Sequence, residues 1–167
     1  VGMNTAAAIT TGSYNSFFGS DSGDATTTGD YNTGIGERSL SANTTADYNT
    51  AIGFQSAKLN TTGTANVALG ADALRQNLTG AANVAVGNNA LVLNTASNNT
   101  AVGKNALTAN TTGTQNTALG MNALASNTTA NDSIAIGYIA LDTMTTGSFN
   151  TCVGSGAGTA TTTGNGN

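Results

Sequence analysis

The sequence predicts an all-β fold, a β-solenoid (parallel β-helix or β-roll) of about ten 17-residue coils. The first observation behind this prediction is a repeat, in which an apolar residue followed by glycine recurs every 17 residues, with one step of 16. The second is composition, because Thr, Ala, Asn and Gly together exceed three fifths of the 167 residues. A fixed period of this kind is typical of stacked repeats, with each coil lying about 4.8 Å above the last.

The repeat unit can be written N-T-A-(V/I/L)-G-x-x-A-L-x-x-N-T-T-G-x-x, and we number its residues as repeat positions 1 to 17. Ten copies fill residues 1–167, which predicts a single repeat array. The chain begins with Val1 and ends in a polar run, so we expect it to be a segment of a longer fibrous protein. In the one short copy we expect the missing residue near Ser97 and Asn98, because turns tolerate deletions.

The first positions of each copy are predicted to form a strand. Alternation along a strand places positions 2 and 4 on one face and position 3, which is mostly Ala, on the other. Position 4 is always apolar, so we expect it to form a core column, with a second buried row of leucines at position 9. The predicted core column is Val1, Phe18, Ile35, Ile52, Leu69, Val86, Val102, Leu119, Ile136 and Val153. The position 9 row is Leu40, Leu74, Leu91, Leu107, Leu124 and Leu141, interrupted by Ala6, Gly23, Ala57 and Gly158.

Glycine at positions 5 and 15 is predicted to form corners that need a positive φ. The second corner is the less demanding one, because Ala46, Ser97 and Ala130 take the place of its glycine. The predicted corner glycines at position 5 include Gly36, Gly53, Gly70, Gly87, Gly103, Gly120, Gly137 and Gly154.

Asparagine recurs at positions 1 and 12, where stacked side chains favour amide ladders that bond to the coils above and below. The predicted position 1 ladder includes Asn32, Asn49, Asn66, Asn83, Asn99, Asn116 and Asn150, with Ser133 as an exception. An alternative is an array of glycosylation sites, because Asn43, Asn60, Asn110 and Asn127 each begin an Asn-Thr-Thr acceptor pattern. A repeat that contains this triplet produces such matches automatically, so the ladder is favoured.

Threonine at position 14 is predicted to form a hydroxyl ladder that closes a turn. A regular Thr column also occurs on ice-binding faces, but two Thr columns on alternate residues would be expected there, and position 12 is mainly Asn.

Composition argues against most catalytic and binding chemistry. The chain has no His, which removes the commonest catalytic base and metal ligand, so we predict no enzyme activity and no cofactor. Four Lys and Arg against eight Asp and Glu predict no nucleic-acid binding. No apolar run approaches the length of a membrane span, so we predict no membrane insertion. A cysteine that is alone in the chain, Cys152, forms no disulfide within it.

Two clusters in the first copies are weaker candidates for a site. Asp21, Asp24 and Asp30 lie around a Ser/Gly turn and could touch a calcium ion, although they do not repeat in the other copies. A group of aromatic residues could stack on sugars, but packing where the position 9 leucine is missing is the plainer interpretation. These aromatic residues are Tyr14, Phe17, Phe18, Tyr31 and Tyr48.

A single thin rod buries about two good aliphatic side chains per coil, which leaves its stability marginal against the entropy of ordering 17 residues. We therefore expect the Ala-rich or β-branched face to pack against identical chains around an axis.

The run from Asn99 to Leu107, followed by Asn-Thr-Thr-Gly at 110–113, resembles repeats of bacteriophage tail-fibre proteins and related bacterial surface proteins. The Ala-(Val/Ile)-Gly core also resembles the head repeats of trimeric autotransporter adhesins, although those have shorter coils. The resemblance covers all ten copies and implies a homotrimeric, extracellular, cell-surface or virion fibre that serves as a shaft or as a surface binding a host glycan or receptor. The resemblance implies no particular binding residues in this chain. Two alternatives stay open, a self-assembling extracellular filament and a glycan-processing fibre enzyme.

Overall fold

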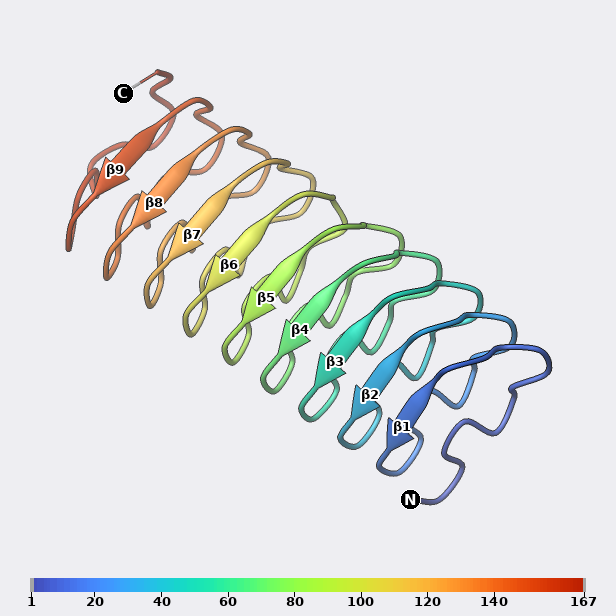
Figure 1. The fold of residues 1–167 in the computed structure, drawn as a ribbon. Coiled ribbons are helices and arrows are strands. Elements are labelled where there is room, and N and C mark those ends of the chain that lie inside the picture. The colour runs from blue at the N-terminus through green and yellow to red at the C-terminus, as the bar shows by residue number, and fades with distance from the viewer. Residues whose placement is uncertain (1, 167) are drawn as a thin grey trace.

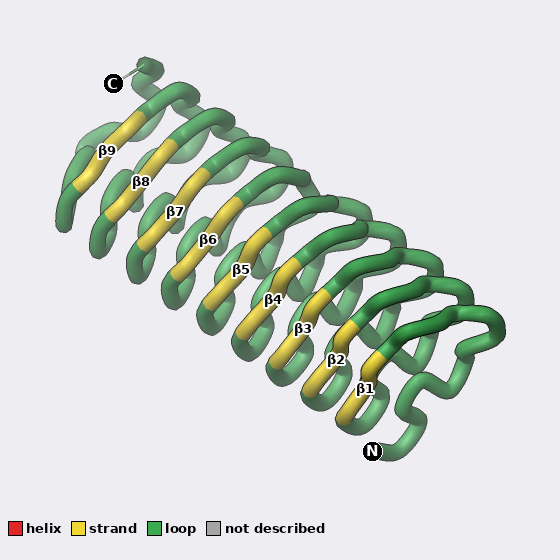
Figure 2. The backbone as a smooth tube through the Cα atoms, viewed as in Figure 1, coloured by secondary structure: helices red, strands yellow, loops and turns green. Residues whose placement is uncertain are grey.

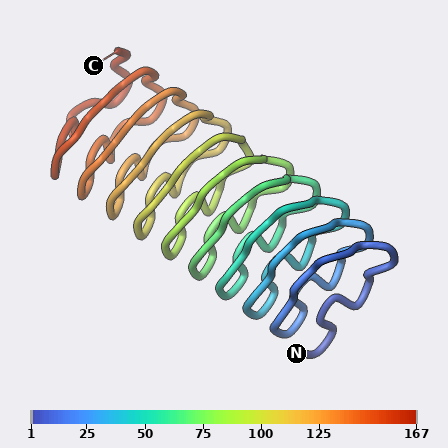
Figure 3. The backbone as a smooth tube through the Cα atoms, in the orientation of Figure 1, coloured from blue at the N-terminus to red at the C-terminus, as the bar shows by residue number. Residues whose placement is uncertain are grey.

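The computed structural model describes residues 2–166 and has the predicted all-β architecture, a parallel β-solenoid. The chain winds as a stack of similar coils, and its N- and C-termini lie at opposite ends of the rod (Figures 1 and 3). Each coil contributes one short strand to a single side of the rod, and turns and loops make up the rest of the coil (Figure 2). None of the described residues belongs to a helix.

The strands occupy repeat positions 2 to 4 and form one parallel sheet in chain order. Each residue pairs with its counterpart one coil further on, so that Thr33 pairs with Thr50 and Ile35 with Ile52. The sequence predicts ten copies, whereas the described residues form nine strands; in the first copy position 4 is Val1, which lies outside the described residues. The strands are β1 Ser16–Phe18, β2 Thr33–Ile35, β3 Thr50–Ile52, β4 Val67–Leu69, β5 Val84–Val86, β6 Thr100–Val102, β7 Thr117–Leu119, β8 Ile134–Ile136 and β9 Thr151–Val153.

The core lies inside the coils and is built from small residues of the strand and leucines of the opposite wall. The Ala side chains at position 3 of β3 to β8 are fully buried, and so are all six predicted leucines at position 9. Where glycine replaces that leucine at Gly23, the ring of Phe17 takes the space, because a Cβ added there would lie 2.5 Å from a ring carbon. The prediction that an aromatic residue compensates for the missing leucine is confirmed for Phe17.

The predicted core column at position 4 points outward, so that prediction is wrong. Ile35 is 41% exposed and Leu119 is 45% exposed, whereas the alanine between positions 2 and 4 is buried in β3 to β8. The reason is geometric. Side chains alternate along a strand, so when the alanine at position 3 points into the coil, the side chains at positions 2 and 4 must point to the outside. Beside the leucine row the interior has room for little more than a methyl group. The misplaced column is Ile35, Ile52, Leu69, Val86, Val102, Leu119, Ile136 and Val153.

The first glycine column has the predicted conformation. Its eight predicted members, Gly36, Gly53, Gly70, Gly87, Gly103, Gly120, Gly137 and Gly154, have φ between 129° and 138°. A side chain is excluded there for a second reason, since a Cβ added to Gly53 would lie 2.5 Å from the carbonyl oxygen of Gly70 in the next coil.

The second glycine column differs from the prediction, because the glycines at position 15 have no positive φ. Glycine serves there for close approach instead, since a Cβ on Gly63 would collide with the Gly80 carbonyl oxygen. In the short coil the residue at this position is Ala96 and not the predicted Ser97. The carbonyl of Ala96 accepts the side-chain amide of Asn83, in the same way that the carbonyl of Gly80 accepts the side-chain amide of Asn66. The missing residue is therefore position 14, between Thr95 and Ala96.

Candidate functional site

The described residues enclose no pocket, and they contain no group of three or more Cys, Asp or Glu side chains placed to hold a metal ion. No helix within residues 2–166 is long and apolar enough to cross a membrane. Any site must therefore be sought among the columns of side chains that run along the rod.

The position 1 asparagines form a buried ladder, as predicted. Asn66 is representative: its Oδ1 accepts the backbone N–H of Asn83 at 3.0 Å, and its Nδ2 donates to the carbonyl of Gly80 at 2.9 Å. Gly80 lies at position 15 of the same copy, almost a full turn further along the chain, and Asn83 begins the next copy, so each side chain acts mainly as a clamp on the backbone one turn away. The predicted members Asn32, Asn49, Asn66, Asn83, Asn99 and Asn116 make the same pair of bonds, and Ser133 replaces the amide oxygen with its hydroxyl toward Asn150.

The position 12 asparagines are also buried, which excludes the predicted alternative of a glycosylation array in the folded chain. The amide of Asn60 donates to Oδ1 of Asn43 at 3.2 Å, and the amide of Asn127 donates to Asn110 at 2.8 Å. All four predicted acceptor asparagines, Asn43, Asn60, Asn110 and Asn127, have no exposed surface. Their amide nitrogens are therefore out of reach of a glycosylating enzyme.

The position 12 ladder breaks at the short coil. Asn77 donates to Asn60 at 3.0 Å, but its own Oδ1 is buried and accepts no hydrogen bond. The ladder resumes where Asn110 donates to Asn94 at 2.7 Å. Deleting one turn residue thus costs the stack one amide contact.

The hydroxyl ladder lies one residue away from the predicted column. Threonines at position 13 donate to the carbonyl of the next coil, as Thr44 does to Thr61 at 3.2 Å and Thr111 does to Thr128 at 2.9 Å. The threonines at position 14, for example Thr45 and Thr62, are exposed instead. The position 14 prediction is wrong because only the preceding hydroxyl faces the coil stack.

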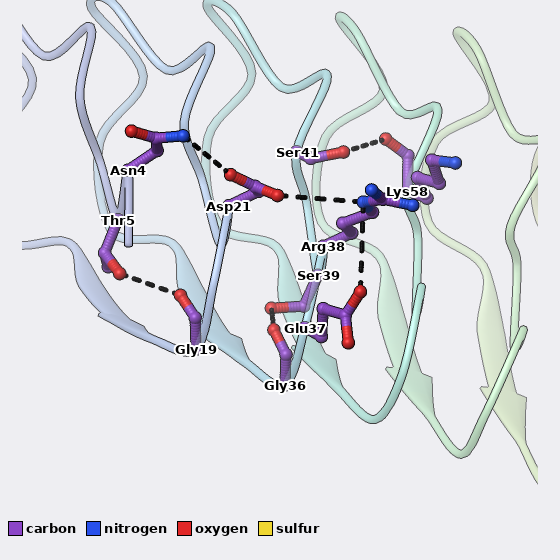
Figure 4. A network of polar contacts seen from close by, with 10 residues as sticks. All are labelled: Asn4, Thr5, Gly19, Asp21, Gly36, Glu37, Arg38, Ser39, Ser41 and Lys58. Atoms are coloured by element: carbon purple, nitrogen blue, oxygen red, sulfur yellow. Dashed lines mark hydrogen bonds and ion pairs between the residues drawn. The ribbon is translucent and has the colours of Figure 1, made fainter. Parts of the chain in front are cut away.

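The charged side chains of the first coils do not form a cation site. Asp21 accepts the Asn4 amide at 3.1 Å and lies 3.7 Å from Arg38 Nε, as Figure 4 shows, while Asp30 accepts the Ser13 N–H at 2.6 Å. Burial, and then the negative charge of Asp21, raise the pKa of Asp24 above its ordinary value. Asp21 and Asp30 are thus engaged with different partners, and the three carboxylates predicted as a calcium cluster do not gather into a group that could hold a metal ion.

The most extensive candidate surface is the outer side of the sheet. We call the side chains at positions 2 and 4 of β1 to β9 the outer sheet face. Position 4 carries Phe, Ile, Leu or Val in all nine strands, and position 2 carries Thr, Val, Ile or Ser. Phe18 and Val153 are 60% and 67% exposed at its two ends. The result is a straight apolar column along the whole rod.

No protein-family model, no curated protein and no solved structure matches this chain.

Proposed function

We propose that the chain is a non-enzymatic structural module that forms the shaft or head of an extracellular or virion fibre, of the kind found in bacteriophage tail fibres and bacterial surface adhesins. Its role is to hold a surface that attaches to a host, through a glycan or receptor, at a distance from the cell or virion. The observation that carries the proposal is the apolar column of the outer sheet face, which continues over nine strands. Extended apolar surfaces on proteins mark interaction sites.

The occupant that we propose for the outer sheet face is the same face of two further copies, in a homotrimer around a common axis. The constant register keeps positions 2 and 4 in straight columns, so identical rods meet with matched faces over their full length. Completing the burial of a half-exposed aliphatic side chain contributes on the order of 1 kcal/mol. Small contributions repeated over nine coils suit a stable cyclic assembly.

Native mass spectrometry tests this assembly. We expect the wild-type chain at micromolar concentration to have three times the 16.3 kDa mass of one chain. The double variant Ile52→Asp and Leu119→Asp places two charges on the outer sheet face and is expected to be monomeric. The matched control Thr62→Asp places its charge on an exposed residue outside that face and is expected to stay trimeric. A monomeric wild-type chain, or a trimer that survives the double substitution, would contradict the proposal.

Electron microscopy of the same material separates the proposed fibre from a self-assembling filament. Rods of uniform length support the trimeric module, whereas filaments that lengthen with concentration favour the filament subunit. A receptor-binding or chaperone domain in the full-length gene would further support the fibre.

A further inference from the structure

Three tyrosines at repeat position 17 form a stacked ladder in the first coils. The ring centroids of Tyr14 and Tyr31 are 4.8 Å apart with planes 8° from parallel. Those of Tyr31 and Tyr48 are 5.0 Å apart with planes 3° from parallel. The column continues as Ala65 and Ala82, so the ladder has three members.

The backbone presents the three rings in the same way. Tyr14, Tyr31 and Tyr48 have nearly equal positive φ angles of 58°, 57° and 60°. The N–H of Tyr31 donates to Ser13 and that of Tyr48 donates to Asp30, both at 3.1 Å. Because each tyrosine repeats the conformation of the one before it, the side chains leave the coil in parallel and the stack is preorganised.

Stacking covers both faces of the middle ring, while all three tyrosines keep exposed surface. Tyr14, Tyr31 and Tyr48 remain 76%, 47% and 61% exposed. Both faces of Tyr31 are occupied by its neighbours, which leaves no face there for a sugar to stack on, so the predicted sugar contact is not supported at this residue. Oxidative coupling takes place at the phenol oxygen and at the ring carbons ortho to it, so the covered faces of Tyr31 do not prevent it.

We propose that this ladder is an oxidative modification site, at which neighbouring tyrosines couple to dityrosine under a haem peroxidase with hydrogen peroxide. The oxidised enzyme removes one electron and one proton from each of two phenols. The two phenoxyl radicals then join through a carbon–carbon bond between the carbons ortho to their oxygens, and the ortho hydrogen of each ring moves as a proton to that ring's oxygen, which restores the phenol and its aromaticity. One peroxide molecule accepts the two electrons and two protons in total and becomes two molecules of water.

The three ladder tyrosines differ from Tyr138, the fourth tyrosine of the chain, because their rings lie next to one another. Tyr138 is 49% exposed, so the oxidant reaches it as readily, but no aromatic ring stacks on it within residues 2–166. Holding two reacting groups side by side raises their effective concentration far above that of separate molecules. The crosslink therefore forms within one chain and joins consecutive coils covalently at the start of the rod. This inference concerns a single chain and does not depend on the proposed trimer.

The test treats the assembled protein with horseradish peroxidase and hydrogen peroxide and measures dityrosine by its fluorescence. Peptide mass spectrometry then identifies the joined tyrosines by the loss of two hydrogen atoms. We expect Tyr14–Tyr31 and Tyr31–Tyr48 crosslinks in material that still migrates as one chain in a denaturing gel. Tyr31→Phe keeps a ring in the stack but removes the shared phenol, and is expected to lower the yield by about tenfold or more.

Tyr138→Phe is the matched control, and its dityrosine yield is expected to equal that of the wild-type chain. Three results would overturn the proposal: an unchanged yield in Tyr31→Phe, crosslinks that involve mainly Tyr138, or dityrosine found only in covalently joined chains. Circular dichroism of Tyr31→Phe identical to the wild-type spectrum verifies that a lower yield reflects the missing phenol and not a misfolded rod.

Discussion

Replacing Asn66 tests the position 1 ladder most directly. In Asn66→Ala, the N–H of the buried Asn83 loses its acceptor, whereas the carbonyl of Gly80 loses one of two donors and keeps the Asn77 amide at 2.7 Å. An unsatisfied buried backbone group costs about 1–3 kcal/mol, so the substitution is expected to lower the free energy of unfolding by about 1–3 kcal/mol. Asn66→Ser is expected to cost less, about 0.5–1.5 kcal/mol for the one lost hydrogen bond to Gly80, because its hydroxyl accepts the Asn83 N–H and leaves no backbone group unsatisfied.

The chain itself supplies the precedent for the serine variant. At Ser133 the hydroxyl accepts the N–H of Asn150 at 3.3 Å, and it makes no bond of the kind that Asn116 makes with the Ala130 carbonyl. Urea unfolding measures the stability of the three proteins, and hydrogen exchange at the Asn83 amide reports the local contact. Exchange is expected to be fastest in the alanine variant. If alanine and serine cost the same, or if alanine costs less than about 0.5 kcal/mol, the ladder does not stabilise the stack as argued.

Three further changes are expected to shift stability in defined directions. Gly53→Ala places a Cβ 2.5 Å from the Gly70 carbonyl oxygen at a φ of 137° and is expected to lower the free energy of unfolding, measured in urea, by about 3 kcal/mol or more; a loss below about 1 kcal/mol would contradict this. Inserting Thr between Thr95 and Ala96 restores the 17-residue coil and lets Asn94 donate a hydrogen bond to Asn77 Oδ1, so the urea midpoint of unfolding is expected to rise. A lower midpoint would show that the shorter turn is the more stable arrangement. Burial raises the pKa of Asp24, so its ionised form is disfavoured in the folded chain and ionisation lowers stability as pH rises through that pKa. Asp24→Asn is therefore expected to raise the melting temperature near neutral pH and to have no effect in acid, where Asp24 is already protonated; an equal gain at both pH values would contradict this.

The repeat made much of the local structure predictable. Glycine at position 5 was predictable because a corner with a φ near 135° excludes residues that carry a side chain, and the Asn ladder was predictable because amides recur at one position in stacked coils. The hydroxyl ladder was placed at position 14 and lies at position 13, since both residues are mostly Thr and only the path of the turn distinguishes them. The tyrosines were predicted as packing residues, and nothing in their spacing distinguishes an exposed ring stack from a buried one.

The period, the parallel stacking and the residues that share each column follow from the sequence, because a fixed repeat places equivalent side chains one above another. Which columns face inward depends on how the coil closes around its interior, and that is visible only in the folded chain. Alternation made positions 3 and 4 opposite in either case, and hydrophobicity favoured Ile52 over Ala51 for the core. The interior is too narrow for both the leucine row and a second row of large side chains, so Ala51 is buried and Ile52 faces outward. That inversion turns the predicted core column into the apolar surface on which the proposed assembly depends.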